Sequence, residues 1–249
     1  MIAGRVKIKS SFLPATPSWV IPGTYLENIQ FLSGKDSIGC VELLFFLYDD
    51  DIRSDFLREL PAIRDFSGRF VFTAHLPDNL SEEHEELVEL LSPLVKHFIV
   101  HPAADTADAQ AQARYLEKWR ARYGKRRFLL ENTSAGRLEA VLDCIDEDAP
   151  VCMDTAHLLI EGKTPSGFAR RYGDRIREVH LNGLGAEDGG DNSGVNGGHK
   201  PLRMEDSWLF ELAPFLRNFS GIVNFELFSW RDVQNSMLCL RQLLDANDV

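Results

Sequence analysis

The sequence predicts a single (β/α)₈ barrel, the TIM-barrel fold, over residues 1–249, and three observations carry this prediction. Eight short apolar segments rich in β-branched and aromatic residues alternate with eight segments of helical periodicity. Most of the apolar segments are nearly continuous, which is typical of a parallel sheet covered on both faces. No glycine-rich nucleotide-binding turn follows any of them, so the eight repeats favour a closed barrel over an open doubly wound sheet.

The expected strands are, in chain order, RVKIKSSF (5–12), IGCVELLFF (38–46), FVFTAHL (70–76), HFIVHP (97–102), RFLLENT (127–133), VCMDTAH (151–157), IREVHLNG (176–183) and GIVNFELF (221–228). The expected helices are 24–33, 54–66, 81–96, 105–123, 136–147, 165–174, 208–219 and 232–246. In the third helix, Ser81 is a suitable N-cap, Glu82 and Glu83 follow in the first turn, and leucines recur on one face. The longest irregular stretch is 182–206, and no linker or domain break is evident.

Composition and charge exclude several classes of protein. The 38 acids outnumber the 27 lysines and arginines, which gives a net charge of −11 and makes nucleic acid a poor candidate partner. The basic run at 120–127 ends a helical pattern, where positive charge is favourable without any phosphate ligand. No window approaches the roughly 18 apolar residues of a membrane span.

The chain start and the cysteines suggest a cytoplasmic setting. The first residues, MIAGRVKIKSSF, lack the apolar region of a secretory signal. The four cysteines (Cys40, Cys144, Cys152 and Cys239) have no regular spacing, so we expect them to be reduced core residues. The oligomeric state is not predicted by any feature of the sequence.

Ionisable side chains recur where the predicted strands end. In a (β/α)₈ barrel the carboxyl ends of the strands build the active site, so these groups are expected to meet at one rim. Any single histidine there is more often a hydrogen-bonded polar group, and a single acid often caps the next helix. Together, however, such groups would suffer desolvation and mutual repulsion unless a cation compensated them. The predicted metal set is His75, His101, Glu131, Asp154, His157, His180, His199 and Glu226.

Imidazole and carboxylate ligands suit Zn²⁺, Mn²⁺, Fe²⁺ or Co²⁺, so we predict one to three divalent ions, with zinc or manganese favoured. The spacing from Asp154 to His157 would let both residues address one pocket or two neighbouring ions. The remaining histidines, His84 and His97, are expected to be structural.

Four further residues are candidates for contacting a substrate. Glu42 interrupts an apolar strand and would either face the barrel lumen toward substrate or form a buried ion pair. Lys200 and Arg203 would hold an anionic group, with solvated loop charge as the alternative, and Trp230 would stack on a ring, with core packing as the alternative.

The pattern of strand-end ligands resembles the xylose-isomerase-like barrel superfamily, which includes sugar isomerases, sugar epimerases and the endonuclease IV group. The likeness covers essentially the whole chain. The superfamily's recurring metal set implies Glu131 in LLENT, Asp154 in MDTAH, His180 in VHLNG and Glu226 in NFELF. The endonuclease IV group adds histidines that His75, His101, His157 and His199 resemble, but Gly197 stands where that group has a loop acid.

The histidine-rich set favours hydrolysis of a phosphodiester in a small molecule. Strings such as VELLFF and TAHLPDNL are similar to cobamide-remodelling phosphodiesterases, which open the nucleotide loop of a corrinoid. In this prediction Glu131 bridges two metals, while His157 and His199 either bind a third ion or act on substrate and protons.

The first alternative is a metal-dependent isomerase or epimerase of a sugar or sugar phosphate, in which Glu131 and Glu226 act as acid and base. The second is a barrel without catalytic activity that only binds or regulates. Retention of the whole four-residue metal set argues against that alternative.

Overall fold

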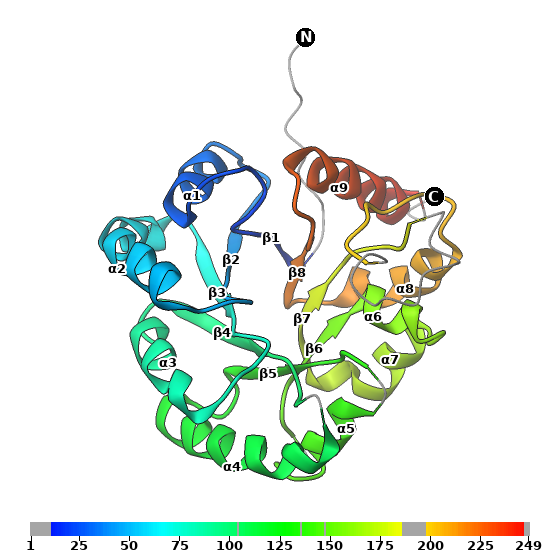
Figure 1. The fold of residues 1–249 in the computed structure, drawn as a ribbon. Coiled ribbons are helices and arrows are strands. Elements are labelled where there is room, and N and C mark those ends of the chain that lie inside the picture. The colour runs from blue at the N-terminus through cyan, green and yellow to red at the C-terminus, as the bar shows by residue number, and fades with distance from the viewer. Residues whose placement is uncertain (1–10, 104, 135, 147, 186–197, 247–249) are drawn as a thin grey trace.

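The computed structural model describes residues 11–103, 105–134, 136–146, 148–185 and 198–246. Eight parallel strands in sequential order close into a barrel, which confirms the predicted fold, and helices surround it (Figure 1). The strands are β1 (Leu13–Pro17), β2 (Cys40–Leu44), β3 (Val71–His75), β4 (Val95–Val100), β5 (Phe128–Glu131), β6 (Val151–Asp154), β7 (Ile176–His180) and β8 (Ile222–Asn224).

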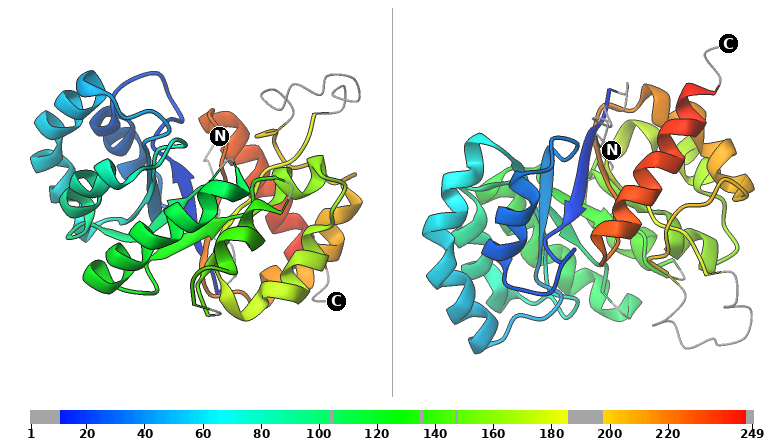
Figure 2. Two further views of the ribbon diagram at one scale, coloured as in Figure 1. Left: turned by 60° about the horizontal axis from the view of Figure 1, so that its bottom comes forward. Right: turned by 90° about the horizontal axis from the view of Figure 1, so that it is seen from above.

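The α-helices lie on the outer side of the strands in both views of Figure 2. They are α1 (Tyr25–Ser33), α2 (Asp50–Arg64), α3 (Glu85–Leu91), α4 (Thr106–Tyr123), α5 (Arg137–Leu142), α6 (Thr155–Ile160), α7 (Pro165–Tyr172), α8 (Ser207–Asn218) and α9 (Trp230–Asp245). In the described part of the chain, three short 3₁₀ helices accompany them, η1 (Asp65–Gly68), η2 (Glu82–His84) and η3 (Gly173–Arg175). Among the described residues, none of these helices has the length and hydropathy that crossing a bilayer needs.

Local signals explain where several helices begin. Thr24 and Glu27 form a capping box at the start of α1, in which each side chain accepts a backbone hydrogen bond. Asp49 caps α2 through the amide of Ile52, which starts that helix four residues before the predicted range. Thr164 caps α7, and Pro165 occupies its first turn, where the missing amide hydrogen costs nothing.

The first predicted strand was wrong. The barrel's first strand is Leu13–Pro17, which pairs with β2 and β8, whereas Ser11 and Phe12 lie outside it and residues 5–10 fall outside the described part. Its sequence, LPATP, contains two prolines that cannot donate to a strand ladder, so propensity favoured the β-branched segment before it.

Several other boundaries differ from those predicted, and the helix expected over 136–147 and the strand expected over 221–228, for example, end early, at Leu142 and Asn224. The helix expected over 81–96 begins as η2 and ends at Leu91, and β4 begins at Val95. The strand expected over 151–157 ends at Asp154, and α6 follows it directly as an additional short helix. All four cysteines are free, but Cys144 is exposed and therefore not part of the core.

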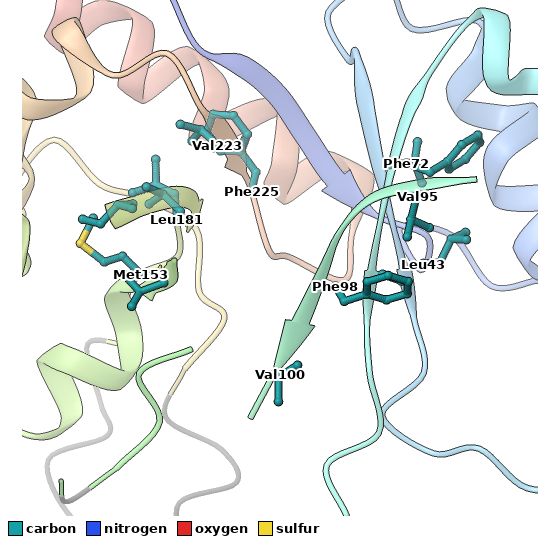
Figure 3. Close-up of a cluster of buried hydrophobic side chains, with 14 of the residues drawn as sticks. Leu43, Phe72, Val95, Phe98, Val100, Met153, Leu181, Val223 and Phe225 are labelled. Atoms are coloured by element: carbon teal, nitrogen blue, oxygen red, sulfur yellow. The ribbon is translucent and has the colours of Figure 1, made fainter. Parts of the chain in front are cut away.

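Alternation along each strand separates the apolar core from the lumen. Side chains such as Leu43, Phe72, Phe98 and Met153 pack in the layer between strands and helices (Figure 3). Their sequence neighbours point to the opposite side, into the barrel. The lumen itself carries a layer of apolar groups, including Ala15, Cys40 and Ile222, and a layer of polar groups closer to the carboxyl ends of the strands.

Candidate metal centre

Alternation brings the predicted ligands to one mouth of the barrel. Leu130, Met153 and Val179 face the outer core, so the next residue in each strand faces inward. Asp154 and His180 are direct partners in the register of β6 and β7. Five of the predicted ligands have at most 2% of their surface exposed, namely His75, Glu131, Asp154, His180 and Glu226.

Seven of the eight predicted ligands form three overlapping groups in which all ligand atoms lie within 4.8 Å of one another. Glu131 belongs to two of these groups and Asp154 to two. The groups are His75–His101–Glu131, Glu131–Asp154–His157 and Asp154–His180–Glu226. The structure therefore brings together the residues that the sequence placed on six separate strands or their ends.

The imidazoles of His75 and His101 are held by acceptors on their outer sides. His75 Nδ1 lies 2.9 Å from the carbonyl oxygen of Leu76, and His101 Nδ1 lies 2.9 Å from Asp78 Oδ1. The charge and hydrogen bond of His101 lower the pKa of Asp78, although burial opposes this, so Asp78 is an ionised acceptor. Because neither oxygen can donate, both Nδ1 atoms carry hydrogen, and the Nε2 atoms are the ones that could offer a lone pair to an ion after losing any proton they hold.

His180 is held in the same way by a carboxylate below it. Its Nε2 atom lies 3.2 Å from Glu42 Oε2, and the other oxygen of Glu42 accepts a 2.8 Å bond from Asn224. His180 Nδ1 consequently faces Glu131 Oε2 and Glu226 Oε2, each at 3.3 Å. A histidine fixed by a carboxylate behind it is the usual arrangement of a metal ligand.

Unpartnered buried atoms show that these residues fit a cation. Glu131 Oε2 and His180 Nδ1 are buried and have no hydrogen-bond partner among the described residues. His75 Nε2 and His101 Nε2 lie 3.1 Å apart, and both ligand atoms are within 4.8 Å of Glu131. A cation would partner the unsatisfied atoms, and the nitrogen and carboxylate donors suit Zn²⁺, Mn²⁺, Fe²⁺ or Co²⁺.

Electrostatics within the protein point to the same requirement for positive charge. Burial opposes ionisation, but the charge of His180 lowers the pKa of Glu226 to about 2 and that of Glu131 well below its usual range. Burial raises the pKa of Asp154 to about 6. Burial alone would lower the pKa of His101, yet the attraction of Glu131 raises it to about 10. Ionised carboxylates are thus balanced by imidazolium protons, which a divalent ion would displace.

Asp154 performs two tasks at once. Its Oδ1 atom accepts a 2.7 Å hydrogen bond from the amide of His157 and so caps α6. This turn directs His157 back to the mouth, where its Nε2 atom lies 3.8 Å from Glu131 Oε1. The three-residue spacing between Asp154 and His157 is therefore the geometry of a helix N-terminus.

Asn182 is a site residue that the sequence reasoning missed. Its amide nitrogen donates to Asp154 Oδ2 and to Glu226 Oε2, both at 3.0 Å, and its oxygen accepts from the amide of Ala156 at 2.9 Å. One fully buried side chain thus joins the ends of β6, β7 and β8. The available signal was a polar residue two positions after His180, directly before a glycine.

His199 lies beside the cluster but in none of the three groups. Its Nδ1 atom is 3.2 Å from the carbonyl oxygen of Glu226 and 3.4 Å from Glu226 Oε2. Its φ of 58° is the left-handed conformation, which is uncommon for a non-glycine residue and is often found at functional sites. Gly197, on which the likeness to the endonuclease IV group depends, lies outside the described residues.

Cys152 is a second residue near the cluster that the sequence did not suggest. Its sulfur lies within 4.8 Å of ligand atoms of Glu131 and His180. Burial raises the pKa of this thiol well above its usual value, so it is a neutral group in the lumen. A neutral thiol is a weaker ligand than the imidazoles and carboxylates around it.

Glu42 and Trp230 follow the alternative interpretations given for them. Glu42 is fully buried beneath His180, so the buried ion pair describes it better than a contact with substrate. Trp230 packs its ring against Phe31, at a centroid distance of 5.8 Å, in the core between α1 and α9.

The two loop cations and the two remaining histidines lie apart from the cluster. Arg203 pairs with Asp206 at 3.1 Å, and Lys200 is exposed on a backbone bridge to Gly183. His84 completes a capping box at η2. His97 is buried with its Nδ1 atom 3.6 Å from Glu178 Oε2, which agrees with a structural role.

Comparisons with known proteins identify the fold. Models of protein families and curated protein sequences give no match to this chain. Its structure is similar to a xylose isomerase domain containing protein from Salmonella typhimurium LT2, with a TM-score of 0.65, 17% identity and coverage of 97% of each chain. It is also similar to an IolI protein with a binding zinc atom, with a TM-score of 0.62, 11% identity and coverage of 94% of this chain and 96% of that one.

A third neighbour is an L-ribulose 3-epimerase, with a TM-score of 0.58, 16% identity and coverage of 94% of this chain and 92% of that one. The chain thus has the xylose isomerase-like barrel fold that the strand-end ligands predicted.

Proposed function

We propose that this chain is a divalent-metal-dependent enzyme that isomerises or epimerises a small polyhydroxylated carbonyl compound, such as a sugar or sugar phosphate. The observation that carries the proposal is the convergence of Glu131 and Glu226 on one atom. Each places a carboxylate oxygen 3.3 Å from His180 Nδ1, although they come from β5 and from the residues after β8. The two carboxylates therefore flank one small volume at the mouth of the barrel.

This geometry suits proton transfer at a carbon atom. Asp154, His180 and Glu226, with Glu131, would hold the ion, which supplies polarisation of the substrate's carbonyl and hydroxyl oxygens when bound. Glu131 and Glu226 then take a proton from the substrate carbon and return it, one acting as base and the other as acid. Asn182 keeps Glu226 and Asp154 in place through its two donated bonds. The fold is shared with an epimerase and a zinc-binding protein, which supports this reaction class.

A second candidate function is hydrolysis of a phosphodiester in a small molecule, with the nucleotide loop of a cobamide as the predicted substrate. One observation favours it, namely the additional group formed by His75, His101 and Glu131. A second ion held there would activate water and neutralise the leaving oxyanion, whereas an isomerase needs fewer ligands. Cytoplasmic location and exclusion of nucleic acid stay predictions from the sequence.

Two measurements on the purified chain separate these candidates. Elemental analysis after zinc loading gives the number of ions, and one ion per chain favours isomerisation while two or three favour hydrolysis. Incubation in D₂O with a panel of ketoses and ketose phosphates, followed by NMR, detects deuterium at carbon. In parallel, bis(p-nitrophenyl) phosphate and a cobamide are tested for cleavage.

We expect deuterium incorporation by the native chain and its loss, together with loss of metal loading, in Glu131→Gln. Glu89→Gln is the matched control, since Glu89 is exposed on the outer face of the barrel and pairs with Arg122. Phosphodiester cleavage without carbon exchange would establish the second candidate, and full turnover of either kind without metal would refute both.

A further inference from the structure

The mouth of the barrel is divided into an ionisable part and an apolar part. The ligand groups come from β3 to β8 or the segments after them. The first three residues after β1 and after β2 are uncharged, and they include Trp19, Phe46 and Leu47. Phe228 follows two residues after Glu226. We call the set of Trp19, Phe46, Leu47 and Phe228 the apolar arc.

The apolar arc leaves large hydrophobic surface exposed. Trp19, Leu47 and Phe228 are 41%, 69% and 44% exposed. Single exposed apolar side chains are normal, but a gathering of them at one place marks a site of interaction. Among the described residues, the only other exposed large hydrophobic side chains are Ile160, Met204, Phe210 and Leu238, and the last two lie on the outer helices α8 and α9.

One end of the apolar arc contacts the metal centre, and the other end contacts His199 beside it. The ring centroids of Phe46 and His75 lie 4.5 Å apart, and those of Phe228 and His199 lie 5.1 Å apart. Strand β1 lies between β8 and β2 in the closed barrel, so the segment with Trp19 lies between those with Phe228 and Phe46. A 2.9 Å hydrogen bond from the amide of Trp230 to the carbonyl of Val20 joins two of these segments.

We propose that the substrate is amphipathic, with a polar reacting group at the metal centre and an apolar or planar portion packed on the apolar arc. An entirely polar small sugar would leave the arc exposed and would gain nothing from it. Burying apolar surface against Trp19 and Phe228 instead adds affinity and orients the reacting group. The inference rests on the proposed function only in requiring a divalent ion at the cluster.

The test compares two hydroxamates that bind zinc through the same group. Acetohydroxamate carries only a methyl group, whereas 2-naphthohydroxamate carries a large planar apolar body. Calorimetric titration of the zinc-loaded full chain should show the naphthyl compound binding at least about tenfold more tightly, as expected for burial of an aromatic body. Trp19→Ala and Phe228→Ala should each reduce this ratio by roughly threefold or more and leave acetohydroxamate binding unchanged.

Phe210→Ala is the matched control, because Phe210 is 47% exposed but lies on α8 outside the mouth. Phe210→Ala should change the affinity for neither acetohydroxamate nor 2-naphthohydroxamate. Equal binding of the two hydroxamates by the native chain overturns the amphipathic substrate alone, as does an equal loss of the ratio in Phe210→Ala. Failure of both compounds to bind overturns the metal centre and the arc with it.

Discussion

Glu42 illustrates how one side chain outside the cluster sets the chemistry of a residue inside it. It is fully buried and contacts His180 on the side away from Glu131. Because Glu42, when ionised, can only accept from His180 Nε2, Nδ1 is the nitrogen that faces the mouth and is available to an ion. Asp78 plays the corresponding part for His101 from the loop after β3.

We expect Glu42→Gln to weaken zinc binding by roughly 10- to 100-fold, because an amide can bind the imidazole in either orientation and no longer fixes its tautomer. Competition with a chromophoric zinc chelator measures the affinity. ¹⁵N NMR of the protein at saturating zinc reports which nitrogen of His180 carries hydrogen, independently of activity. Unchanged affinity and an unchanged tautomer in a folded Glu42→Gln protein would refute this role, and Glu89→Gln serves as the control.

His101 gives the metal-free protein a defined dependence on pH. Burial disfavours its charged form, but Glu131 and Asp78 raise its pKa to about 10, above the roughly 6.5 of an unfolded histidine. The stabilisation is therefore fully present below pH of about 6.5 and is lost as pH rises through about 10. Urea unfolding of the metal-free protein should show the free energy of unfolding falling across this window. In His101→Gln the free energy of unfolding should fall less across this window, whereas in the control His84→Gln it should fall as in the native chain. The same pH dependence in the native chain and both variants would contradict this role of His101.

Strand boundaries depend on contacts that extend beyond one segment. Asp154 ends β6 because its side chain caps α6, and Gly221 stands immediately before β8 because no side chain fits there. A Cβ atom at Gly221 would lie 2.3 Å from the carbonyl oxygen of Arg177, which belongs to the backbone of β7, and 2.3 Å from Phe219 Cζ. The start of β8 thus requires close approach of two backbones.

Gly221→Ala should lower the free energy of unfolding by about 1–3 kcal/mol, since backbone atoms of β7 would have to shift. Gly173→Ala is the comparison, because that glycine is helical and has no atom within 4 Å of an added Cβ. It should be neutral or stabilise by about 0.4–1 kcal/mol through the unfolded chain. Chemical denaturation of both variants measures their free energies of unfolding. A Gly221→Ala protein as stable as Gly173→Ala would show that β8 has room to adjust.

For the molecule as a whole, an ion at the candidate metal centre would link distant parts of the barrel. The candidate ligands come from β3 to β8 or the segments that follow them, so such an ion would join strands that are distant in sequence. The same closure concentrates buried acid and imidazole at one mouth, which costs stability without a compensating charge. We therefore expect stability to be coupled to metal loading.

Zinc at about 100 times its dissociation constant should stabilise the native chain by about 2.7 kcal/mol. For a chain of this size such a gain raises the Tm by roughly 5–10 °C, which differential scanning calorimetry with and without zinc would detect. His180→Asn should abolish the increase, whereas Glu89→Gln should retain it. A native chain whose Tm does not respond to zinc would contradict the metal centre.

Residue types and their periodicity were enough to predict the barrel, the order of its elements and the gathering of Glu131, Asp154, His180 and Glu226 at one mouth. Apolar alternation and ionisable strand ends are local patterns, and closure of parallel strands necessarily brings their carboxyl ends together. The position of β1 escaped this reasoning, because pairing with β2 and β8 overrides the poor strand propensity of LPATP.

Tertiary structure alone decided which polar groups support the ligands. Asn182, Asp78 and Glu42 have no distinguishing spacing, and their hydrogen bonds join segments up to 182 residues apart. Which nitrogen of each histidine faces the mouth depends on those partners, and the apolar arc exists only because β1 closes the barrel between β8 and β2. Local sequence specifies which chemical groups are available, whereas closure of the barrel specifies which of them meet, because contacts across the lumen depend on the packing of all eight strands.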